Sequence, residues 1–396
     1  VGRAQGSWHA GSEGVVGATA ARSMPAAPRA VGVASTLLSA TQRDDYVRQI
    51  KLEYQAACQR RAKQQLARDL VSMEQARANR TPIDWQAYLP PVPARLGVQV
   101  LHDVPISSLI PYIDWTFFFH AWELKGRYPA ILDDREKGAE ARRLLQDAQD
   151  MLQQITAEGW LRAAAVIGLF PANSHDDDIV IYQDESRKQV LTNFHCLRKQ
   201  GKQPSGRYNE SLADFVAPSA SGVGDYLGAF ACTAGQGIDD KLAQFEADHD
   251  DYGAIMLKAL ADRLAEALAE WLHQQVRQEY WGYATDERLD NEQLIKEAYR
   301  GIRPALGYPA CPDHTEKDQL WKLLQVKENI GIWLTEAKAM VPTAAVSGLY
   351  FSHPDSRYFA VGKIERDQVS DYARRKGMEI REVERWLAPN LAYDPN

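Results

Sequence analysis

Apolar positions along the chain recur at helical spacing in two long stretches. Over residues 138–158 they return at steps of three and four, which predicts a helix with one buried face. Over 247–280, Leu257, Leu260 and Leu264 repeat the same spacing with Asp, Glu and Lys between them. The second stretch therefore predicts one long amphipathic helix.

Shorter apolar stretches predict strands. Residues 163–170 form a continuous apolar run with β-branched members, and 179–182 follow after an acidic run that we interpret as a solvated turn. Residues 347–352 and 358–364 are aromatic and β-prone, and helical spacing returns over 368–387. Strands and long helices without a regular βαβ alternation predict an α+β fold.

The N-terminal part has a different pattern. Residues 1–28 are rich in Gly, Ala and Ser and begin with Val1, so we expect a disordered or truncated tail. Residues 44–79 are typical of a polar helical connector, and the proline-broken segment 85–93 reads as a linker before the folded domain.

One loop concentrates groups with binding chemistry. Residues 301–316 contain Pro304, Pro309 and Pro312, which fix φ and remove backbone donors, and Gly307, which tolerates a positive φ. The segment is therefore neither helix nor strand. A stiff loop that carries a guanidinium, a phenol, an imidazole and a thiol is a place where a scaffold presents groups to a ligand.

Composition narrows the classes of function. The 396 residues are 45% hydrophobic with a net charge of -7, which allows a sizeable core and argues against a nucleic-acid surface. The four cysteines lack paired spacing, so neither a disulfide framework nor a zinc site is expected. No run approaches the ~20 apolar residues of a membrane span. We expect a soluble cytoplasmic protein that binds neither nucleic acid nor membranes.

Two glycine pairs do not make a dinucleotide fold. Gly222 and Gly224, like Gly235 and Gly237, lack the third glycine of a Gly-x-Gly-x-x-Gly turn between strand and helix. This argues against a Rossmann methyltransferase.

The proline loop also carries a resemblance to a known family. Residues 303–312 read RPALGYPACP and resemble the signature of the S-adenosylmethionine-binding activation domain of cobalamin-dependent methionine synthase. Further matching words occur in the same order, at 112–116 (YIDWT), 168–173 (GLFPAN), 212–218 (LADFVAP) and 352–356 (SHPDS). The resemblance extends from about residue 29 to the C-terminus.

The resemblance implies a domain organisation. It predicts a single curved α+β domain over 91–396, built on a twisted antiparallel sheet flanked by long helices. It assigns 29–90 to the end of a cobalamin domain followed by a helical linker. The cobalt-ligating Asp-x-His-x-x-Gly word is missing, as are the homocysteine and folate domains. The chain alone is therefore not expected to make methionine.

The same resemblance implies a binding site. The ligand has a sulfonium, an ammonium, a carboxylate and an adenine, so its site needs an anion, a cation, hydrogen bonds and an aromatic surface. The matching positions implied for S-adenosylmethionine are Asp114, Arg303, Ala305, Gly307, Tyr308, Tyr358 and Phe359. Glu266 and Glu297, on predicted helices, match positions that face the corrin of a docked cobalamin domain. No catalytic residue and no metal ligand is assigned.

Each assignment has a structural alternative. Arg303 could be a surface residue that caps a helix over 291–300, and Asp114 could be an N-cap before Trp115. Tyr358 and Phe359 could be sheet core. Glu266 and Glu297 could lie on solvated helix faces. For His314 and Cys311, which are three residues apart, packing is expected in place of metal binding.

The resemblance implies a role in reactivation. In that family, oxidised cob(II)alamin is rescued with one electron from a flavodoxin-type donor and a methyl group from S-adenosylmethionine. The cofactors implied are therefore S-adenosylmethionine and a cobalamin carried by a partner domain, and the enzyme is methionine synthase. An alternative is a free-standing reactivation partner that acts in trans on a separate cobalamin protein. A third hypothesis, an unrelated methyltransferase, has no support in the sequence.

Overall fold

The computed structural model describes residues 43–52 and 69–395. The chain divides into two units, and the larger one contains residues 72–396. In the smaller unit, residues 43–52 are helical, whereas residues 53–68 of the expected connector and the predicted tail over 1–28 lie outside the described residues. No helix in the described part of the chain is both long and apolar enough to cross a bilayer.

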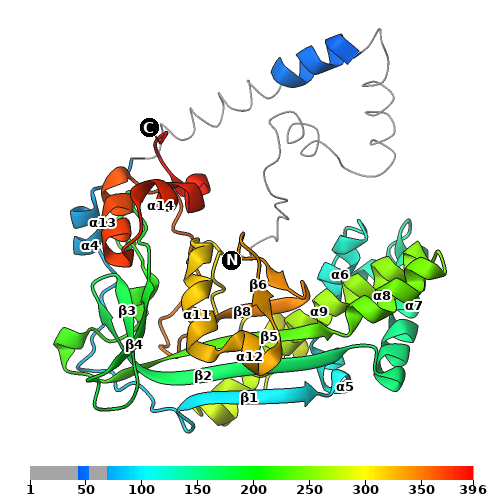
Figure 1. Ribbon diagram of the computed structural model, residues 1–396, viewed down its shortest axis with the longest axis horizontal. Coiled ribbons are helices and arrows are strands. Elements are labelled where there is room, and N and C mark those ends of the chain that lie inside the picture. The colour runs from blue at the N-terminus through cyan, green and yellow to red at the C-terminus, as the bar shows by residue number, and fades with distance from the viewer. Residues whose placement is uncertain (1–42, 53–68, 396) are drawn as a thin grey trace. The chain divides into compact units, whose positions relative to one another are not determined.

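A six-stranded antiparallel sheet organises the larger unit (Figure 1). The strand order is β4-β3-β2-β5-β8, and β1 pairs with the first half of β2. The strands are β1 (Gly97–Val104), β2 (Arg162–His175), β3 (Asp178–Tyr182), β4 (Val190–His195), β5 (Asp225–Gln236) and β8 (Ala345–Tyr350). A separate two-stranded ribbon pairs β6 (Trp333–Leu334) with β7 (Met340–Val341). The α+β prediction is confirmed.

The central strand β2 is buried on both faces, which explains its continuous apolar sequence. Ala163, Ala165 and Ile167 belong to a core shared with the helices on one face. Val166 and Phe170 belong to the core on the other face. Alternate residues of one strand thus support two hydrophobic layers.

Long helices cover the first face. They are α7 (Gly138–Glu158), α8 (Ile238–Ala247) and α9 (Asp251–Gln275), with a π-helical turn over Val276–Tyr280. The helix α9 packs against β5 and β8 and buries Leu257, Leu260 and Leu264. Both long helices predicted from spacing are confirmed, although a break near residue 248 separates α8 from α9.

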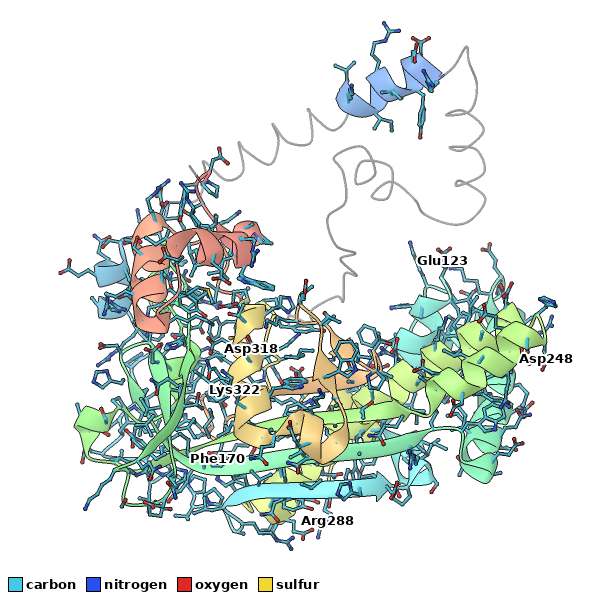
Figure 2. All side chains as sticks on the ribbon, viewed as in Figure 1. Glu123, Phe170, Asp248, Arg288, Asp318 and Lys322 are labelled. Atoms are coloured by element: carbon cyan, nitrogen blue, oxygen red, sulfur yellow. The ribbon has the colours of Figure 1, made fainter. Side chains whose placement is uncertain are left out.

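Short helices cover the second face and the C-terminal region. On the second face, α11 (Lys317–Leu324) and α12 (Val326–Ile330) pack near Phe170 of β2 (Figure 2). The remaining helices are α4 (Met73–Ala78), α5 (Ile106–Leu109), α6 (Trp115–Ala121), α10 (Asn291–Ile295), α13 (Arg366–Lys376) and α14 (Ile380–Trp386).

Three predicted elements are corrected. The β-prone segment 358–364 is not a strand, because its backbone contacts the proline loop through a single Val361 N–H to Pro309 carbonyl bond of 2.8 Å. The helix predicted over 368–387 is broken at Gly377, which ends α13 in a left-handed conformation. The helix predicted over 291–300 ends at Ile295.

The acidic run over 176–178 contains the predicted turn, but only Asp176 is exposed to solvent. Asp177 is fully buried and pairs with Arg198 at 2.6 Å and with Arg77 at 2.8 Å. Arg77 belongs to α4 and also pairs with Asp371 of α13. Residues 73–78 are therefore held in the folded unit, while the boundary expected at residue 90 stays a prediction.

Candidate functional site

The proline loop begins with an isolated backbone pairing beside the end of β8. Ile302 and Phe351 exchange backbone hydrogen bonds of 3.0 and 3.1 Å, and the Pro304 carbonyl accepts the Leu349 N–H at 3.0 Å. The segment from Ile302 to Pro304 thus continues the sheet edge. This pairing gives the backbone around Arg303 a defined direction, because a sheet edge fixes which way successive side chains point.

The loop then turns tightly at Gly307. Its φ is +91°, and its N–H donates to the Cys311 carbonyl at 2.8 Å. The imidazole of His314 covers this turn so closely that a Cβ on Gly307 would lie 2.3 Å from its ring atoms. Glycine is required here for both reasons. Tyr308 follows with 45% of its surface exposed, although it is a large aromatic residue.

Arg303 is gripped by two side chains. One oxygen of Glu270, Oε2, lies 2.9 Å from both Nη1 and Nη2. The hydroxyl of Tyr299 accepts a third contact from Nη1 at 3.0 Å. The backbone N–H of Arg303 donates to the Tyr358 hydroxyl at 2.9 Å. Arg303 is therefore not the surface helix cap of the structural alternative.

Glu270 is a contact that the sequence pattern did not single out. It lies on α9 and is nine-tenths buried, and its second oxygen has no partner among the described residues. Burial raises the pKa of Glu270, which the charges of Arg303 and Arg277 oppose. The available signal was a glutamate in the apolar stretch 267–273, where a charged residue needs a buried partner.

A stack of aromatic rings lies next to Tyr299, one of the two side chains that contact Arg303. The ring of His273 is stacked on Tyr350 at 5.1 Å, and Tyr350 is stacked on Phe230 at 4.5 Å. Tyr299 meets the edge of His273 at 4.9 Å. Burial, together with the charges of Arg277 and Arg303, lowers the pKa of His273 well below its ordinary value, so the ring is neutral.

The two predicted cobalamin-facing carboxylates lie in the same neighbourhood. Glu266 is an exposed residue of α9, and both Glu266 and Glu297 act electrostatically on Glu270. Glu297 is not on a helix, however. It follows the end of α10 at a φ of +56°, because the helix stops at Ile295.

Asp114 begins the short helix α6. Its carboxylate accepts the Thr116 N–H at 3.0 Å, so the N-cap geometry named as the alternative is present. The segment around it packs on α9, and Asn291 of α10 donates to the Ile113 carbonyl at 3.3 Å. Asp114 and Arg303 thus belong to elements that contact the same helix.

The remaining predicted residues surround the loop. Tyr358 and Phe359 are partly buried against the second core, and Phe359 meets the edge of Phe215 at 6.4 Å. Ala305 is half-buried beside Arg303. The core role named as an alternative therefore holds for part of each aromatic ring, while the hydroxyl of Tyr358 faces the Arg303 backbone.

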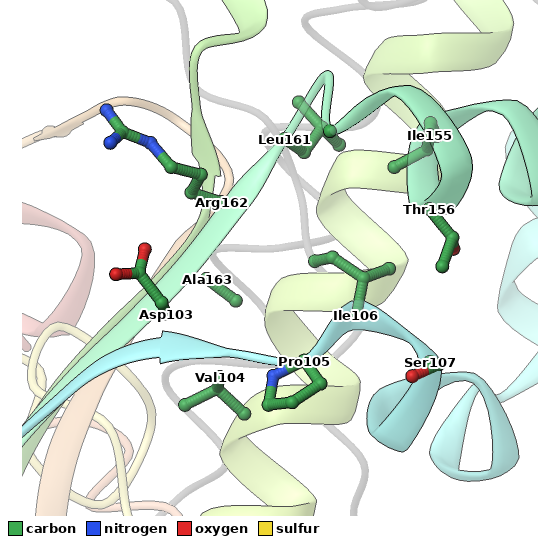
Figure 3. A pocket seen from close by; sticks show the side chains of 11 residues that line it. Asp103, Val104, Pro105, Ile106, Ser107, Ile155, Thr156, Leu161, Arg162 and Ala163 are labelled. Carbon is green, nitrogen blue, oxygen red and sulfur yellow. The ribbon is translucent and has the colours of Figure 1, made fainter.

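An open cavity of about 250 Å³ lies elsewhere, where β1 and β2 meet α5 and the end of α7 (Figure 3). Asp103 and Arg162 are at its polar side, and Ile106 and Ile155 are at its apolar side. None of the residues selected from the sequence lines it. Within residues 43–52 and 69–395, no group of three or more His, Cys, Asp or Glu residues is arranged to hold a metal ion.

Comparison with known proteins gives the family. The model of the vitamin B12 dependent methionine synthase activation domain matches residues 105–377. The chain belongs to this activation-domain family. The crystal structure of a MetH reactivation domain bound to AdoHcy is 59% identical, with a TM-score of 0.80, and the match covers 82% of this chain and 99% of that one. The activation domain described here is thus part of the B12-dependent methionine synthases, which are methyltransferases.

Proposed function

We propose that this activation domain binds S-adenosylmethionine at the proline loop and presents its methyl group to a cobalamin carried by another domain. The observation that carries the proposal is Arg303, a guanidinium anchored on one side and open on the other. The similar reactivation domain holds AdoHcy, which is S-adenosylmethionine without its methyl group.

The residues present suit this ligand. Arg303 has donors left for the α-carboxylate, and Asp114 offers an anion for the ammonium. The exposed ring of Tyr308 provides an aromatic surface next to the turn at Gly307, and both Gly307 and Ala305 are only partly buried. Tyr358 and Phe359 complete the pocket through backbone and ring contacts.

The domain works by positioning. When bound, S-adenosylmethionine supplies an electrophilic methyl group. Transfer of this methyl group to a cobalamin reduced by one electron would leave AdoHcy as the other product. The side chains of this domain would hold the methyl donor in place for a docked cobalamin domain, so that the reacting atoms would meet without a diffusional search.

Two partners follow from this reaction. A cobalamin domain must dock on the face that carries Glu266, Glu297 and Tyr308, which are all exposed. A flavodoxin-type donor must supply the electron. Carboxylates at the docking face could order water or accept a hydrogen bond from a docked cobalamin domain.

Removing the guanidinium tests the site. Arg303→Ala is expected to weaken S-adenosylmethionine binding by about 2 to 4 kcal/mol, the range for a lost charge-assisted contact. Isothermal calorimetry measures this directly. Arg95→Ala is the matched control, because Arg95 forms an exposed ion pair with Glu279. Equal affinities for the wild type and Arg303→Ala would refute the assignment.

A second titration tests the partner. Addition of a purified cobalamin domain to the protein loaded with S-adenosylmethionine should give a complex by analytical ultracentrifugation. Glu266→Lys, on the exposed face of α9, should weaken it while leaving S-adenosylmethionine affinity within about twofold. Undiminished assembly by this variant would place the docking face elsewhere.

A further inference from the structure

The geometry of the Arg303 guanidinium determines which of its donors are available to a ligand. An arginine has five N–H groups in one plane. They form an end fork from Nη1 and Nη2, a side edge from Nε and the outer hydrogen of Nη2, and one outer hydrogen on Nη1. Each edge matches the two oxygens of a carboxylate.

Glu270 and Tyr299 occupy the end of the guanidinium. Oε2 of Glu270 lies 2.9 Å from both Nη1 and Nη2, which places it in the end fork. The Tyr299 hydroxyl takes the remaining hydrogen of Nη1 at 3.0 Å. The side edge, formed by Nε and the outer hydrogen of Nη2, has no contact with Glu270 or Tyr299.

This side edge is accessible. Nε of Arg303 donates to no described residue, and it is not a fully buried atom. The whole side chain is 19% exposed. The two parallel donors therefore point where a carboxylate from outside can approach them.

The contact between Arg303 and Glu270 is not arranged for the greatest stability of the fold. Glu270 is nine-tenths buried, and its Oε1 is left without a partner in the described residues. A buried carboxylate oxygen without a hydrogen bond costs free energy. Tyr299, in contrast, is fixed by the edge of His273 at 4.9 Å and by the Arg277 guanidinium, 4.1 Å from its ring centre. Arg303 is held between a buried carboxylate and a hydroxyl whose ring is fixed by its neighbours.

On the basis of the proposed function, we propose that Glu270 and Tyr299 are positioning residues that turn the Nε–Nη2 edge of Arg303 toward the α-carboxylate of S-adenosylmethionine. They do not touch the ligand. They remove the other orientations of a flexible cation, so binding is preorganised and specific for a ligand that carries the carboxylate.

Two ligands distinguish positioning of Arg303 for the carboxylate from a general effect on the binding site. The first is S-adenosylmethionine, and the second is decarboxylated S-adenosylmethionine, which keeps the sulfonium and the adenosine. Glu270→Gln is expected to bind the first about tenfold more weakly, and Tyr299→Phe about threefold more weakly, as for one misoriented or lost hydrogen bond. Both variants should bind the decarboxylated ligand within about twofold of the wild type. In the Arg303→Ala background neither substitution should weaken S-adenosylmethionine binding further.

The controls separate three results. Glu279→Gln makes the same chemical change in an exposed ion pair near the end of the long helix, and it should alter neither affinity. Tyr299→Phe keeps the stacked ring, so it carries the test if Glu270→Gln does not fold. Equal weakening of both ligands, or no weakening of either, overturns the positioning role. A wild type that binds neither ligand overturns the proposed function itself.

Discussion

Two ion-paired arginines of this domain, one fully buried and one partly exposed, are held in opposite ways. Arg198, which follows β4, has all five N–H groups paired. Its contacts are two Asp177 bonds of 2.6 and 2.8 Å, two Asp214 bonds of 2.7 and 2.8 Å and the Asn209 carbonyl at 2.7 Å. Arg303 contacts one carboxylate oxygen and one hydroxyl.

The difference shows what each ion pair is for. The side chains of Arg198, Asp177 and Asp214 are at most 3% exposed, so every charge is compensated inside the protein and nothing remains for a ligand. In the Arg303–Glu270 pair, Nε of Arg303 and Oε1 of Glu270 have no hydrogen-bond partner among the described residues. Complete pairing ties segments together, whereas incomplete pairing at an accessible edge suits binding.

The largest effect expected from this comparison is on stability. Arg198→Met should lower the free energy of unfolding by about 3 to 5 kcal/mol, because buried Asp214 loses its counter-charge and buried Asp177 keeps only Arg77. Arg303→Ala should cost clearly less, since its side chain is partly exposed. Urea denaturation of both variants measures the difference. Equal losses would mean that Arg303 is a structural residue of the same kind.

A smaller effect is expected at the turn of the proline loop. Gly307→Ala should lower the free energy of unfolding by about 2 to 3 kcal/mol, because the new Cβ is strained at positive φ and collides with His314. Gly377→Ala is the matched control, since its φ is +66° and an added Cβ would meet no atom within 4 Å, and it should cost about 1 kcal/mol. Similar decreases in the free energy of unfolding for the two variants would show that the His314 ring moves aside at little cost.

The smallest effect concerns another buried atom without a partner among the described residues, Nε2 of His353. Burial lowers the pKa of His353 to about 4, from 6.5 in the unfolded chain, while nearby Asp355 opposes the shift and Arg300 adds to it. The unfolded state therefore binds the proton first, and the stability contributed by His353 is lost as pH falls from 6.5 to 4.

His353→Phe tests this linkage. The phenyl ring keeps the packing between Trp85 and Tyr88 and cannot titrate. The loss of stability between pH 6.5 and 4 should shrink by about 1 kcal/mol, a value discounted for solvent screening. Unfolding curves at both pH values measure it. An unchanged pH slope would show that His353 does not titrate in this range.

Much of the fold follows from local pattern. The spacing of leucines predicts α7 and α9, and the apolar run over 163–170 predicts β2, because burial of one helix face or of both strand faces leaves a periodic signature. The words around Arg303 indicate the family. The ends of elements are less predictable: Gly377 interrupts one predicted helix, and the turn at Glu297 follows another that stops early.

The partners of charged residues were decided by the tertiary structure. Asp177 reads as part of a solvated run and is buried by an arginine 21 positions away, and Glu270 meets Arg303 across 33 positions. Neither pairing leaves a periodic mark, because a charge is neutralised by whatever the folded chain brings within a few ångströms of it. The sequence by itself determined the elements, the proline loop and its family resemblance. Only the packing of α9 against β8 and the loop decided which side chains hold Arg303, and which edge of it stays open.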